Sequence, residues 1–514
     1  MMKSMNTPLP PLIQALLAPH RYPGVVQQVE LAQTHISWIL LAGEFAYKIK
    51  KPVQLPFLDF STLARRHACC QDELRLNQRF APDIYLDVVG IFNTPQDPSW
   101  RGTGEPIEYA VRMKRFDEAG RLDHLCQRGE LQSTHLSDLA DTLATFHAQA
   151  AQAPADSRFG RPDDWMVLAR DNFHDLLLAL PQQEHQARLQ ALRIWTEAQF
   201  TQLEPLMLAR KKAGWVRECH GDLHLANLVL INHRVRMFDC IEFNEALRWI
   251  DVANEIAFTY MDLLEHQQPG LANWFVNELL SRSGDYEAAL LLRFYAVYKA
   301  LIRAKVAALQ RKGAQNDDAP VLAYLALAER LAAPAPKRLI ITHGLSGCGK
   351  TYASSTYLLN DPLANTLRLR SDVERKRLFG LRSTEHRVSA PDTGIYSRET
   401  THQTYAHLRD LAHRLLTAGG TVMVDAAFLQ RSQRDSFQAL AEEHHAIFEI
   451  LAPQATPEQL AERIQTRNAL AHDASDATLE VLAQQMRVLE PLQADELARL
   501  ANLLPGSGNS FMVT

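Results

Sequence analysis

The sequence predicts a multidomain α/β protein, and three features of the chain lead to that fold class. With 514 residues, the chain is too long to fold around one hydrophobic core. The segment 333–336 reads Ala-Pro-Ala-Pro, and proline restricts its own backbone and that of the residue before it. Directly after this segment, a short apolar strand runs through a glycine-rich loop into a helix. We therefore expect a first domain over 1–332, a short stiff linker over 333–336, and over 337–514 a three-layer α/β/α domain with a parallel sheet.

The composition is ordinary for a globular protein and excludes several classes of partner. Hydrophobic residues make up 46% of the chain and charged residues 22%, and the formal net charge of −5 gives no basic field for nucleic acid. No apolar run approaches the roughly 18 residues that a membrane-spanning helix needs, and residues 1–23 lack the apolar core of a signal peptide. The six cysteines contain no C-x-x-C pair, which favours free thiols in a reducing compartment. We expect a cytoplasmic protein with small-molecule partners, and neither nucleic acid nor a membrane.

The clearest motif of the first domain lies at residues 220–227, which read His-Gly-Asp-Leu-His-Leu-Ala-Asn. The motif fits the pattern H-x-D-L-x-x-x-N of kinase catalytic loops, with glycine at the second position. An aspartate at the place of Asp222 can accept the proton of a substrate hydroxyl, and an asparagine at the place of Asn227 can hold a metal ion on the ATP phosphates. We count His220, from the same motif, with Asp222 among the candidate catalytic residues.

A second acidic residue follows where such a site needs it. The runs 228–231 and 235–238 predict the two strands of a tight β-hairpin, with its turn over 232–234. The hairpin delivers Asp239 at the end of its second strand, where kinases place a metal-binding aspartate. A chance match to one short motif is common, but loop, hairpin and second aspartate together form a specific signal.

These residues resemble the aminoglycoside phosphotransferase and choline kinase branch of the protein-kinase-like fold, whose members use H-G-D-x-x-x-x-N and a later aspartate. Because a second nucleotide motif follows, the chain as a whole resembles the bacterial bifunctional aminoglycoside phosphotransferase/ATP-binding proteins. The resemblance implies a bilobal kinase-like fold for 1–332, with a small lobe from residue 25 to 116 and a helical large lobe from 117 to 332. It also implies ATP and Mg²⁺ as cofactors, but it identifies no acceptor.

The small lobe begins with a predicted β-hairpin, in which strands over 36–41 and 45–50 flank a turn over 42–44. Lys48 and Lys50 are two residues apart, so both side chains point to one face of a strand. By resemblance to the strand lysine of kinases, we choose Lys48 as the residue that binds the α/β-phosphates of ATP, with Lys50 and Lys51 as alternatives. The segment 30–37 contains no glycine, and this lack of a glycine-rich loop argues against an ordinary protein kinase.

Further elements are predicted in order along the first domain. A helix over 61–79, with Ser61 as a plausible N-cap, carries Glu73, our candidate partner for the strand lysine; Asp72 is the alternative. Strands over 84–91 and 108–114 would complete the small lobe, and the resemblance places the adenine near 111–113. Helices are predicted over 134–150, between 160 and 210, over 285–311 and over 319–332. Asp251 either supports the catalytic loop, as the resemblance implies, or caps the helix that follows it.

The second domain opens with the strand 338–343 and the loop 344–351, which reads Gly-Leu-Ser-Gly-Cys-Gly-Lys-Thr. The loop fits the phosphate-binding motif G-x-x-x-x-G-K-[ST] in the strand–loop–helix context that the motif requires. Backbone N–H groups of such a loop surround phosphates at a helix N-terminus, while the lysine reaches the β/γ-phosphates and the threonine binds Mg²⁺. The predicted nucleotide-binding residues here are Gly344, Ser346, Gly347, Cys348, Gly349, Lys350 and Thr351.

Four more residues complete the predicted second site. Asp425 ends an apolar strand over 420–425 and would act on the metal through water. Asp372 follows another strand and opens a helix; its resemblance to an aspartate of small-molecule P-loop kinases implies that it orients or deprotonates the acceptor hydroxyl, and capping of the helix is the alternative. Arg463 and Arg467 are four residues apart and would neutralise phosphate charge, unless they form a solvated helix face. This domain resembles the gluconate kinase, polynucleotide kinase and zeta-toxin group of P-loop kinases.

We therefore expect a bifunctional ATP-dependent phosphotransferase, with both domains transferring the γ-phosphoryl group to hydroxyls of small-molecule acceptors. One alternative is a first-domain kinase that is regulated by a nucleotide-gated P-loop module. Another is a protein kinase or autokinase, against which the missing glycine-rich loop weighs. The sequence identifies neither acceptor nor an oligomeric state.

Overall fold

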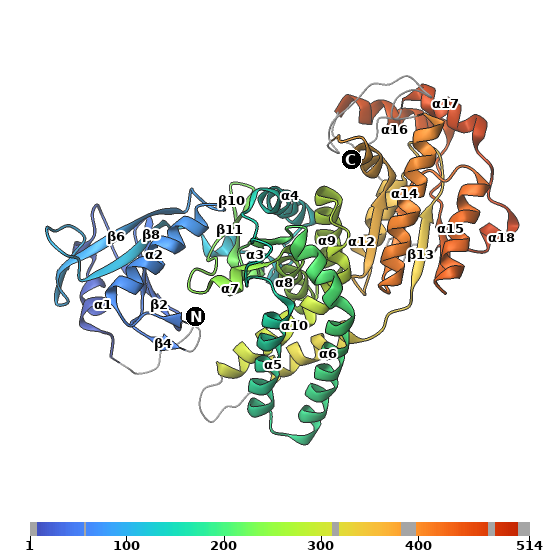
Figure 1. Ribbon diagram of the computed structural model, residues 1–514. Helices are drawn as coiled ribbons and strands as arrows, with labels where there is room; N and C mark the ends of the chain where they lie inside the picture. The colour runs from blue at the N-terminus through green and yellow to red at the C-terminus, as the bar shows by residue number, and fades with distance from the viewer. Residues whose placement is uncertain (1–7, 56–57, 311–317, 382–396, 471–477, 502–514) are drawn as a thin grey trace. The chain divides into compact units, whose positions relative to one another are not determined.

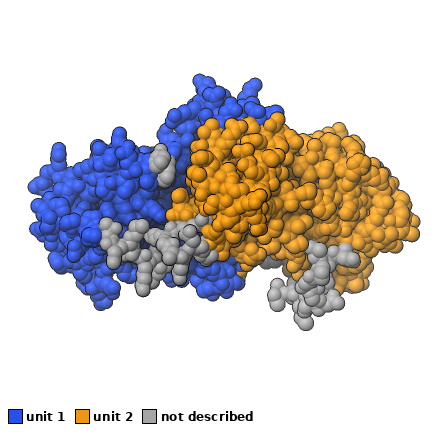
Figure 2. All heavy atoms as spheres, turned by 90° about the horizontal axis from the view of Figure 1, so that it is seen from below, with its two compact units in different colours: residues 1–131, 150–165, 204–258 blue, residues 132–149, 166–203, 259–514 orange. Residues whose placement is uncertain are grey.

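The computed structural model describes residues 8–55, 58–310, 318–381, 397–470 and 478–501 (Figure 1). Internal contacts divide the chain into two compact units (Figure 2): unit 1 comprises 1–131, 150–165 and 204–258, and unit 2 comprises 132–149, 166–203 and 259–514. Helices that precede the predicted linker thus share unit 2 with the P-loop region, while the boundary at 333–336 itself stays a prediction. Within the described ranges, no helix combines the length and apolar character needed to cross a membrane.

Unit 1 is built on an antiparallel sheet with the strand order β1-β2-β3-β8-β6-β7. The predicted first hairpin forms from β2 and β3, and Lys48 on β3 lies opposite Ile39 on one side and Val111 of β8 on the other. Ile49 is buried in the apolar core on one face of the sheet, so Lys48 and Lys50 share the other face. The strands of this unit are β1 (Val29–Gln33), β2 (Ser37–Ala42), β3 (Phe45–Lys50), β4 (Gln54–Leu55), β5 (Leu58–Asp59), β6 (Tyr85–Thr94), β7 (Asp97–Ser99) and β8 (Glu108–Lys114).

The helix α2 (Leu63–Asn77) packs against β6 and β8 and buries polar side chains on its inner face. Its N-cap is Thr62, whose hydroxyl accepts a hydrogen bond from the Arg65 amide, so the predicted cap at Ser61 was wrong; Ser61 donates to Asp59. Glu73 is fully buried, whereas the side chain of its neighbour Asp72 is 48% exposed. A helix with a buried carboxylate needs charged partners, and the adjacent strand β3 supplies them.

Two short pairs of antiparallel strands lie near the functional loops of unit 1. The strands β9 (Val216–Glu218) and β12 (Trp249–Asp251) pair on either side of the catalytic loop in sequence. The strands β10 (Leu228–Ile231) and β11 (Arg234–Met237) form the second predicted hairpin, and its turn is the two-residue step Asn232–His233. Both turn residues have positive φ, 49° and 60°, which matches the twist of the flanking strands. The remaining helices of unit 1 are α1 (Pro11–Leu16), α3 (Leu122–Gln127) and α7 (Glu245–Arg248).

The predicted helices of the first domain all form, and the stretch from 160 to 210 contains two of them. Three helices cross the dividing line between the units: α5 (Pro162–Ala179), α6 (Gln183–Lys212) and α8 (Val252–Glu265). Unit 2 contains α4 (Ser133–Gln149), α9 (Pro269–Ser283), α10 (Ala288–Leu309) and α11 (Ala319–Ala332). The apolar faces of α10 and α11 pack on one another.

The P-loop region of unit 2 has the predicted parallel sheet, with the order β14-β15-β13-β16. Its strands are β13 (Arg338–Thr342), β14 (Thr366–Arg370), β15 (Thr421–Asp425) and β16 (Ile447–Leu451). The helices around them are α12 (Lys350–Leu359), α13 (Ser371–Leu378), α14 (Arg398–Thr417), α15 (Arg431–Glu443), α16 (Pro457–Leu470), α17 (Leu479–Val488) and α18 (Ala494–Leu497). Because all four strands run in one direction, their carboxyl ends meet at one edge, where ligands bind in such sheets.

Buried polar contacts hold helix α9 against β14, the outer strand of this sheet. The side chain of Asn277 donates to the Thr366 carbonyl at 2.8 Å and accepts from the Arg368 amide at 2.6 Å, so it satisfies two backbone groups of the edge strand β14. Asn273 donates to the Leu358 carbonyl at the end of α12, at 3.2 Å. These contacts supply partners for an otherwise exposed strand edge. Residues before the predicted linker therefore complete the packing of the P-loop region.

Candidate functional site

The first candidate site is organised around the fully buried carboxylate of Glu73. Lys48 on β3 bonds to Glu73 Oε1 at 2.7 Å and to Asp239 Oδ1 at 2.5 Å. Burial alone would lower the pKa of Lys48, but the Asp239 and Glu73 carboxylates hold it well above its ordinary value. The structure thus places three residues predicted from distant parts of the sequence in one chain of ion pairs. A lysine fixed in this way stays charged and points towards Asp239, the predicted metal-binding residue.

Lys50 occupies a different position from Lys48, although both lysines contact Glu73. Its side chain is fully buried, lies 2.5 Å from Glu73 Oε2 and forms a further ion pair with Glu242. Burial would raise the pKa of Glu73, but the Lys48 and Lys50 ammonium groups lower it to about 2. Sequence reasoning missed Glu242, because only the fold brings it to β3. Lys51, the other alternative, is bonded to the Thr34 carbonyl at 2.6 Å, so the geometry favours Lys48 as the phosphate-binding lysine.

The catalytic loop holds Asp222 and Asn227 side by side. The Asn227 amide nitrogen donates to the Asp222 carbonyl at 2.9 Å and to Asp222 Oδ2 at 3.1 Å. The Asp222 side chain remains 37% exposed, so a substrate hydroxyl can reach it. Gly221 has a φ of 88°, and an added Cβ would lie 2.7 Å from the Leu247 carbonyl oxygen. Glycine is therefore required at the position where protein kinases carry arginine.

His220 is fully buried, and both of its ring nitrogens are engaged inside the loop. Nδ1 accepts from the Asp222 amide at 3.3 Å, and Nε2 lies 2.9 Å from the Phe238 carbonyl. Burial lowers the pKa of the imidazole, so the ring is neutral near pH 7 with its proton on Nε2. His220 thus links the catalytic loop to the residue before Asp239, which is the geometry of a positioning residue.

The sequence left two roles open for Asp251: support of the loop 220–227 or capping of the helix that follows. In the structure, these two roles belong to two different acids, Asp251 and Glu255. Asp251 accepts from the Ala253 amide at 2.8 Å and pairs with Arg210 at 2.9 Å, so it caps the following helix. Glu255, which sequence reasoning missed, accepts from the His220 amide at 2.8 Å and thereby supports the catalytic loop. Glu255 lies one helical turn after Asp251, and this spacing is the sequence signal that could have indicated that both acids face the same loop.

The donor set of the first site fits a hard divalent cation such as Mg²⁺. Asp239 presents a carboxylate whose side chain is 43% exposed. It adopts a φ of 62°, and its amide donates to the Tyr85 hydroxyl at 3.0 Å. The nitrogen of the Asn227 amide is turned to Asp222, so its oxygen is the atom that can coordinate a metal. Carboxylate and amide oxygens are ligands that Mg²⁺ prefers.

The second candidate site lies at the carboxyl edge of the parallel sheet. Gly347 has a φ of 85°, and its loop leads into α12, at whose first turn Lys350 and Thr351 stand. The Lys350 ammonium donates to the carbonyls of Gly344 and Leu345 at 2.9 and 2.8 Å. Asp425 is buried at the end of β15 and accepts from the Ser354 hydroxyl at 2.9 Å. The predicted loop, lysine and acidic strand end are therefore brought together.

Asp372 also lies at this edge, because Arg370 at the end of β14 is in register with Asp425. Burial raises the pKa of the Asp372 carboxyl, and the nearby Arg375 and Arg370 guanidinium groups oppose that rise. The side chain of Arg463 donates to the Gly347 carbonyl at 3.4 Å, so it reaches the loop. Arg467 belongs to the same helix, but its side chain lies outside the described residues. Of the loop residues, Ser346 has its amide bonded to Gln485 of α17 at 2.8 Å, a contact that sequence reasoning missed.

Fold and geometry give the class of this protein: a kinase-like fold, followed in the chain by a P-loop domain with a parallel sheet. Residues 339–492 match the model of a protein family that is described as an AAA domain. Uncharacterized proteins of Mycobacterium tuberculosis and Mycobacterium bovis are each 29% identical to the chain over 463 residues, which is 88% of this chain and 89% of each relative.

Three solved structures that are named as kinases are similar to parts of the chain. A choline/ethanolamine kinase family protein from Mesorhizobium loti is 11% identical, with a TM-score of 0.38, and spans 62% of this chain and 92% of its own. A choline kinase from Streptococcus pneumoniae is 13% identical, with a TM-score of 0.35 and coverage of 60% and 93%. A putative kinase from Chloroflexus aurantiacus is 20% identical, with a TM-score of 0.25 and coverage of 31% and 84%.

Proposed function

We propose that the chain is a bifunctional ATP-dependent phosphotransferase, in which both sites transfer the γ-phosphoryl group of ATP to a hydroxyl of a small-molecule acceptor. The observation that carries this proposal is the ion-pair chain from Glu73 through Lys48 to Asp239. Kinase chemistry consists mainly of positioning and charge stabilisation, and it needs a lysine held by an acid beside the metal-binding aspartate.

In the first site, Asp222 accepts the proton of the acceptor hydroxyl as the hydroxyl oxygen bonds to the γ-phosphorus. The bond between that phosphorus and the β–γ bridging oxygen breaks, and ADP leaves with the bond's electron pair. Lys48 binds the α/β-phosphates, and Asp239 and Asn227 hold Mg²⁺, which supplies charge neutralisation on the β- and γ-phosphates when bound. Asp222 is suited to its role because its carboxylate is accessible and oriented by Asn227.

The second site would perform the same reaction with a different set of residues. The loop amides and Lys350 bind the phosphates, Thr351 and Asp425 hold the metal, and Asp372 receives the acceptor proton. Burial raises the pKa of the Asp372 carboxyl, so its carboxylate is a stronger base than that of an exposed aspartate. Arg463 would add positive charge at the transferred group.

Acceptor-dependent turnover tests the proposal and assigns each activity to a site. ATP hydrolysis and phosphate transfer are measured with a panel of sugars, polyols, nucleosides and aminoglycosides. We expect Asp222→Asn to lower the rate at the first site by about 10²–10⁴-fold, and Lys350→Ala to abolish turnover at the second. Asp97→Asn, at an aspartate whose side chain is 70% exposed and pairs with Arg21, is the control and should retain full activity. Turnover with an acceptor that neither Asp222→Asn nor Lys350→Ala lowers would contradict the proposal.

A regulatory role for the P-loop region is the second candidate, and the α9 contacts favour it. Asn273 bonds to the C-terminal end of α12 and Asn277 bonds to β14, so a nucleotide-dependent shift of these elements would act directly on α9. This candidate predicts tight ATP binding that Lys350→Ala abolishes, without acceptor-dependent turnover at the second site.

The contact between Gln485 and the loop leads to a separate prediction. The Ser346 amide donates a hydrogen bond to the side-chain oxygen of Gln485. A bound phosphate would need the same N–H group as a donor. We expect Gln485→Ala to tighten ATP binding at the second site by up to about tenfold, the value of one hydrogen bond. Calorimetry in a Lys48→Met background isolates the second site. Weaker binding by Gln485→Ala would instead make Gln485 a part of the nucleotide site.

A further inference from the structure

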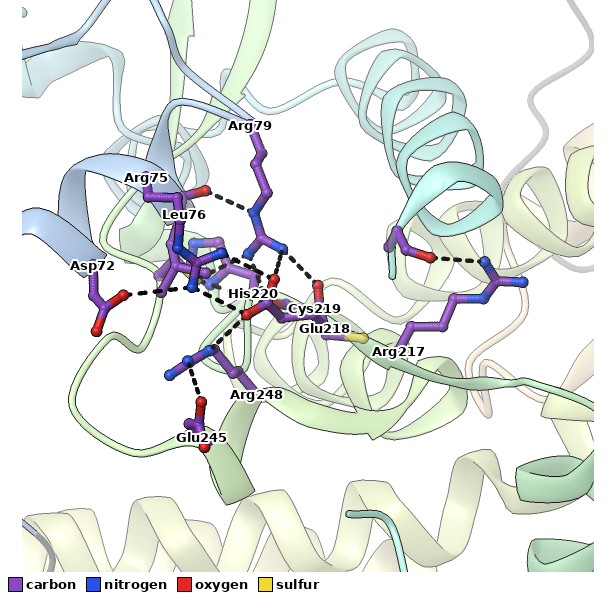
Figure 3. A network of polar contacts seen from close by, with 12 residues as sticks. Asp72, Arg75, Leu76, Arg79, Arg217, Glu218, Cys219, His220, Glu245 and Arg248 are labelled. Carbon is purple, nitrogen blue, oxygen red and sulfur yellow. Dashed lines mark hydrogen bonds and ion pairs between the residues drawn. The ribbon is translucent and has the colours of Figure 1, made fainter. Parts of the chain in front are cut away.

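Glu218 is the last residue of β9 and stands two positions before His220 of the catalytic loop. Its side chain is 10% exposed and lies at the centre of the polar network that Figure 3 shows. The sequence motifs of the two sites do not include it. Burial would raise the pKa of this carboxyl, but hydrogen bonding and charge from the surrounding arginines lower it, so Glu218 is ionised at neutral pH.

Three guanidinium groups converge on this one carboxylate. Arg75 donates to both of its oxygens at 3.3 Å, Arg79 donates to Oε2 at 3.1 Å, and Arg248 donates to Oε1 at 3.2 Å. Arg75 lies in the last turn of α2 and Arg79 follows the helix by two residues, so both arginines come from the C-terminal end of α2. Arg248 comes from α7, on the far side of the catalytic loop in sequence.

The same arginines also bond to the backbone around both functional loops. Arg79 donates to the carbonyls of Glu218 and Cys219 at 2.8 and 3.2 Å, directly before His220. Arg248 donates to the Glu242 carbonyl at 3.2 Å, in the segment that follows Asp239. The network therefore connects the end of α2 with the catalytic loop and with the metal-binding segment. Because α2 also carries Glu73, the position of this helix decides whether Lys48 is held.

Charge explains why Glu218 matters more than its neighbours in this network. Two further acids contact these arginines, Asp72 on Arg75 and Glu245 on Arg248, and their side chains are 48% and 57% exposed. Solvent screens such exposed pairs, so each contributes little. Removal of the Glu218 charge would leave three guanidinium groups close together without their shared partner, and their repulsion would push α2 away from the loop.

We propose that Glu218 is a positioning residue of the first site: it fixes α2 to the catalytic loop through Arg75 and Arg79 and so keeps Glu73 on Lys48. The effect on ATP rests on the proposed function, whereas the fastening of α2 does not. The proposal is therefore tested by two measurements: the affinity for ATP, which depends on the proposed function, and the hydrogen exchange of the α2 amides, which does not.

The test compares Glu218→Gln with Glu245→Gln, both in a Lys350→Ala background that leaves ATP only the first site. We expect Glu218→Gln to raise the dissociation constant for ATP about tenfold, the equivalent of one charge-assisted contact, and to raise hydrogen exchange of the α2 amides to a similar extent. Glu245→Gln removes a charge from Arg248 at the surface and should change both values less than twofold. Arg75→Gln, at a half-exposed arginine, should give the same pattern at smaller size if Glu218→Gln fails to fold.

A double variant separates positioning from general stability. If Glu218 acts through Glu73, the loss of ATP affinity in Glu218→Gln should disappear in a Glu73→Gln background, whereas a merely structural effect would add to it. Unchanged α2 exchange in Glu218→Gln, or additive losses in the double variant, overturns the proposal. If the Lys350→Ala parent binds no ATP, the proposed function fails, and the exchange of α2 alone decides for or against the positioning role.

Discussion

Replacement of Gly270 by alanine is expected to destabilise unit 2 by more than about 4 kcal/mol, which is exceptional for a single methyl group. Gly270 lies at the start of α9, and a Cβ built there would stand 1.8 Å from the Leu359 carbonyl oxygen and 2.6 Å from its carbon. Both atoms belong to the backbone at the end of α12 and cannot move aside as a flexible side chain would. In an exposed helix, the same change would stabilise by about 1 kcal/mol, so the contact with α12 reverses the sign.

The free energy of unfolding in urea measures this effect. Gly420→Ala is the matched control, because the nearest atom to its Cβ would be 3.7 Å away and its φ is not positive. We expect that control to change stability by less than about 1 kcal/mol. Equal stabilities for Gly270→Ala and the unaltered chain would show that α9 does not pack on α12 as closely as described.

Lys50→Met is expected to lower the free energy of unfolding by about 3–5 kcal/mol, the cost of removing one partner from a buried ion pair. Methionine fills a similar volume but leaves the buried Glu242 carboxylate, and one oxygen of Glu73, without the ammonium group. We expect Glu242→Gln to restore part of the loss in the Lys50→Met background, because it removes the stranded charge. A control at Lys51, whose ammonium is exposed and bonded to the Thr34 carbonyl, should have little effect when changed to methionine.

The stability difference between Lys50→Met and the unaltered chain should also depend on pH. Two lysines lower the pKa of folded Glu73 to about 2, below its ordinary value of 4.5. A lowered pKa contributes stability that is fully present above pH 4.5 and is lost as the pH falls towards 2. This contribution is about 3 kcal/mol, and Lys50→Met removes part of it. The difference should therefore be largest near neutral pH and shrink between pH 4.5 and 2. A constant difference over that range would exclude Glu73 as its source.

Local sequence patterns were sufficient for the elements that carry the motifs. The strand pairs around Lys48 and before Asp239, and the strand–loop–helix at Lys350, form as predicted, except that the turn before Asp239 has two residues, 232–233, instead of the three predicted over 232–234. In each case the signal lies within a few residues, because turn residues, alternation and glycine spacing act locally. The wrong prediction of the cap at Ser61 is also a local error, of one residue. The cap is set by which of two adjacent hydroxyls accepts a hydrogen bond from the first helical turn.

Choices between neighbouring residues required the three-dimensional fold. The sequence left Glu73 and Asp72 open, and the phase of α2 against the sheet buries the first and exposes the second. The partners that support the sites were missed for a related reason. Glu242 meets a lysine 192 positions earlier in the chain, and Glu218 meets arginines about 140 positions earlier. No periodicity within one segment can indicate such pairs.

The sequence by itself therefore determined the local elements from which the chemistry is proposed: the loop 220–227 with the later Asp239, and the glycine-rich loop 344–351 on a parallel sheet. Those depend on residue types at short, fixed spacing, which the backbone geometry of loops and strands imposes directly. Only the tertiary structure decided which acid binds which lysine, which carboxylate pairs with the arginines at the end of α2, and that α9 packs against the edge strand of the P-loop sheet. Burial and long-range packing set these relations, because the charge on a buried group is stabilised only by the partners that the whole fold brings to it.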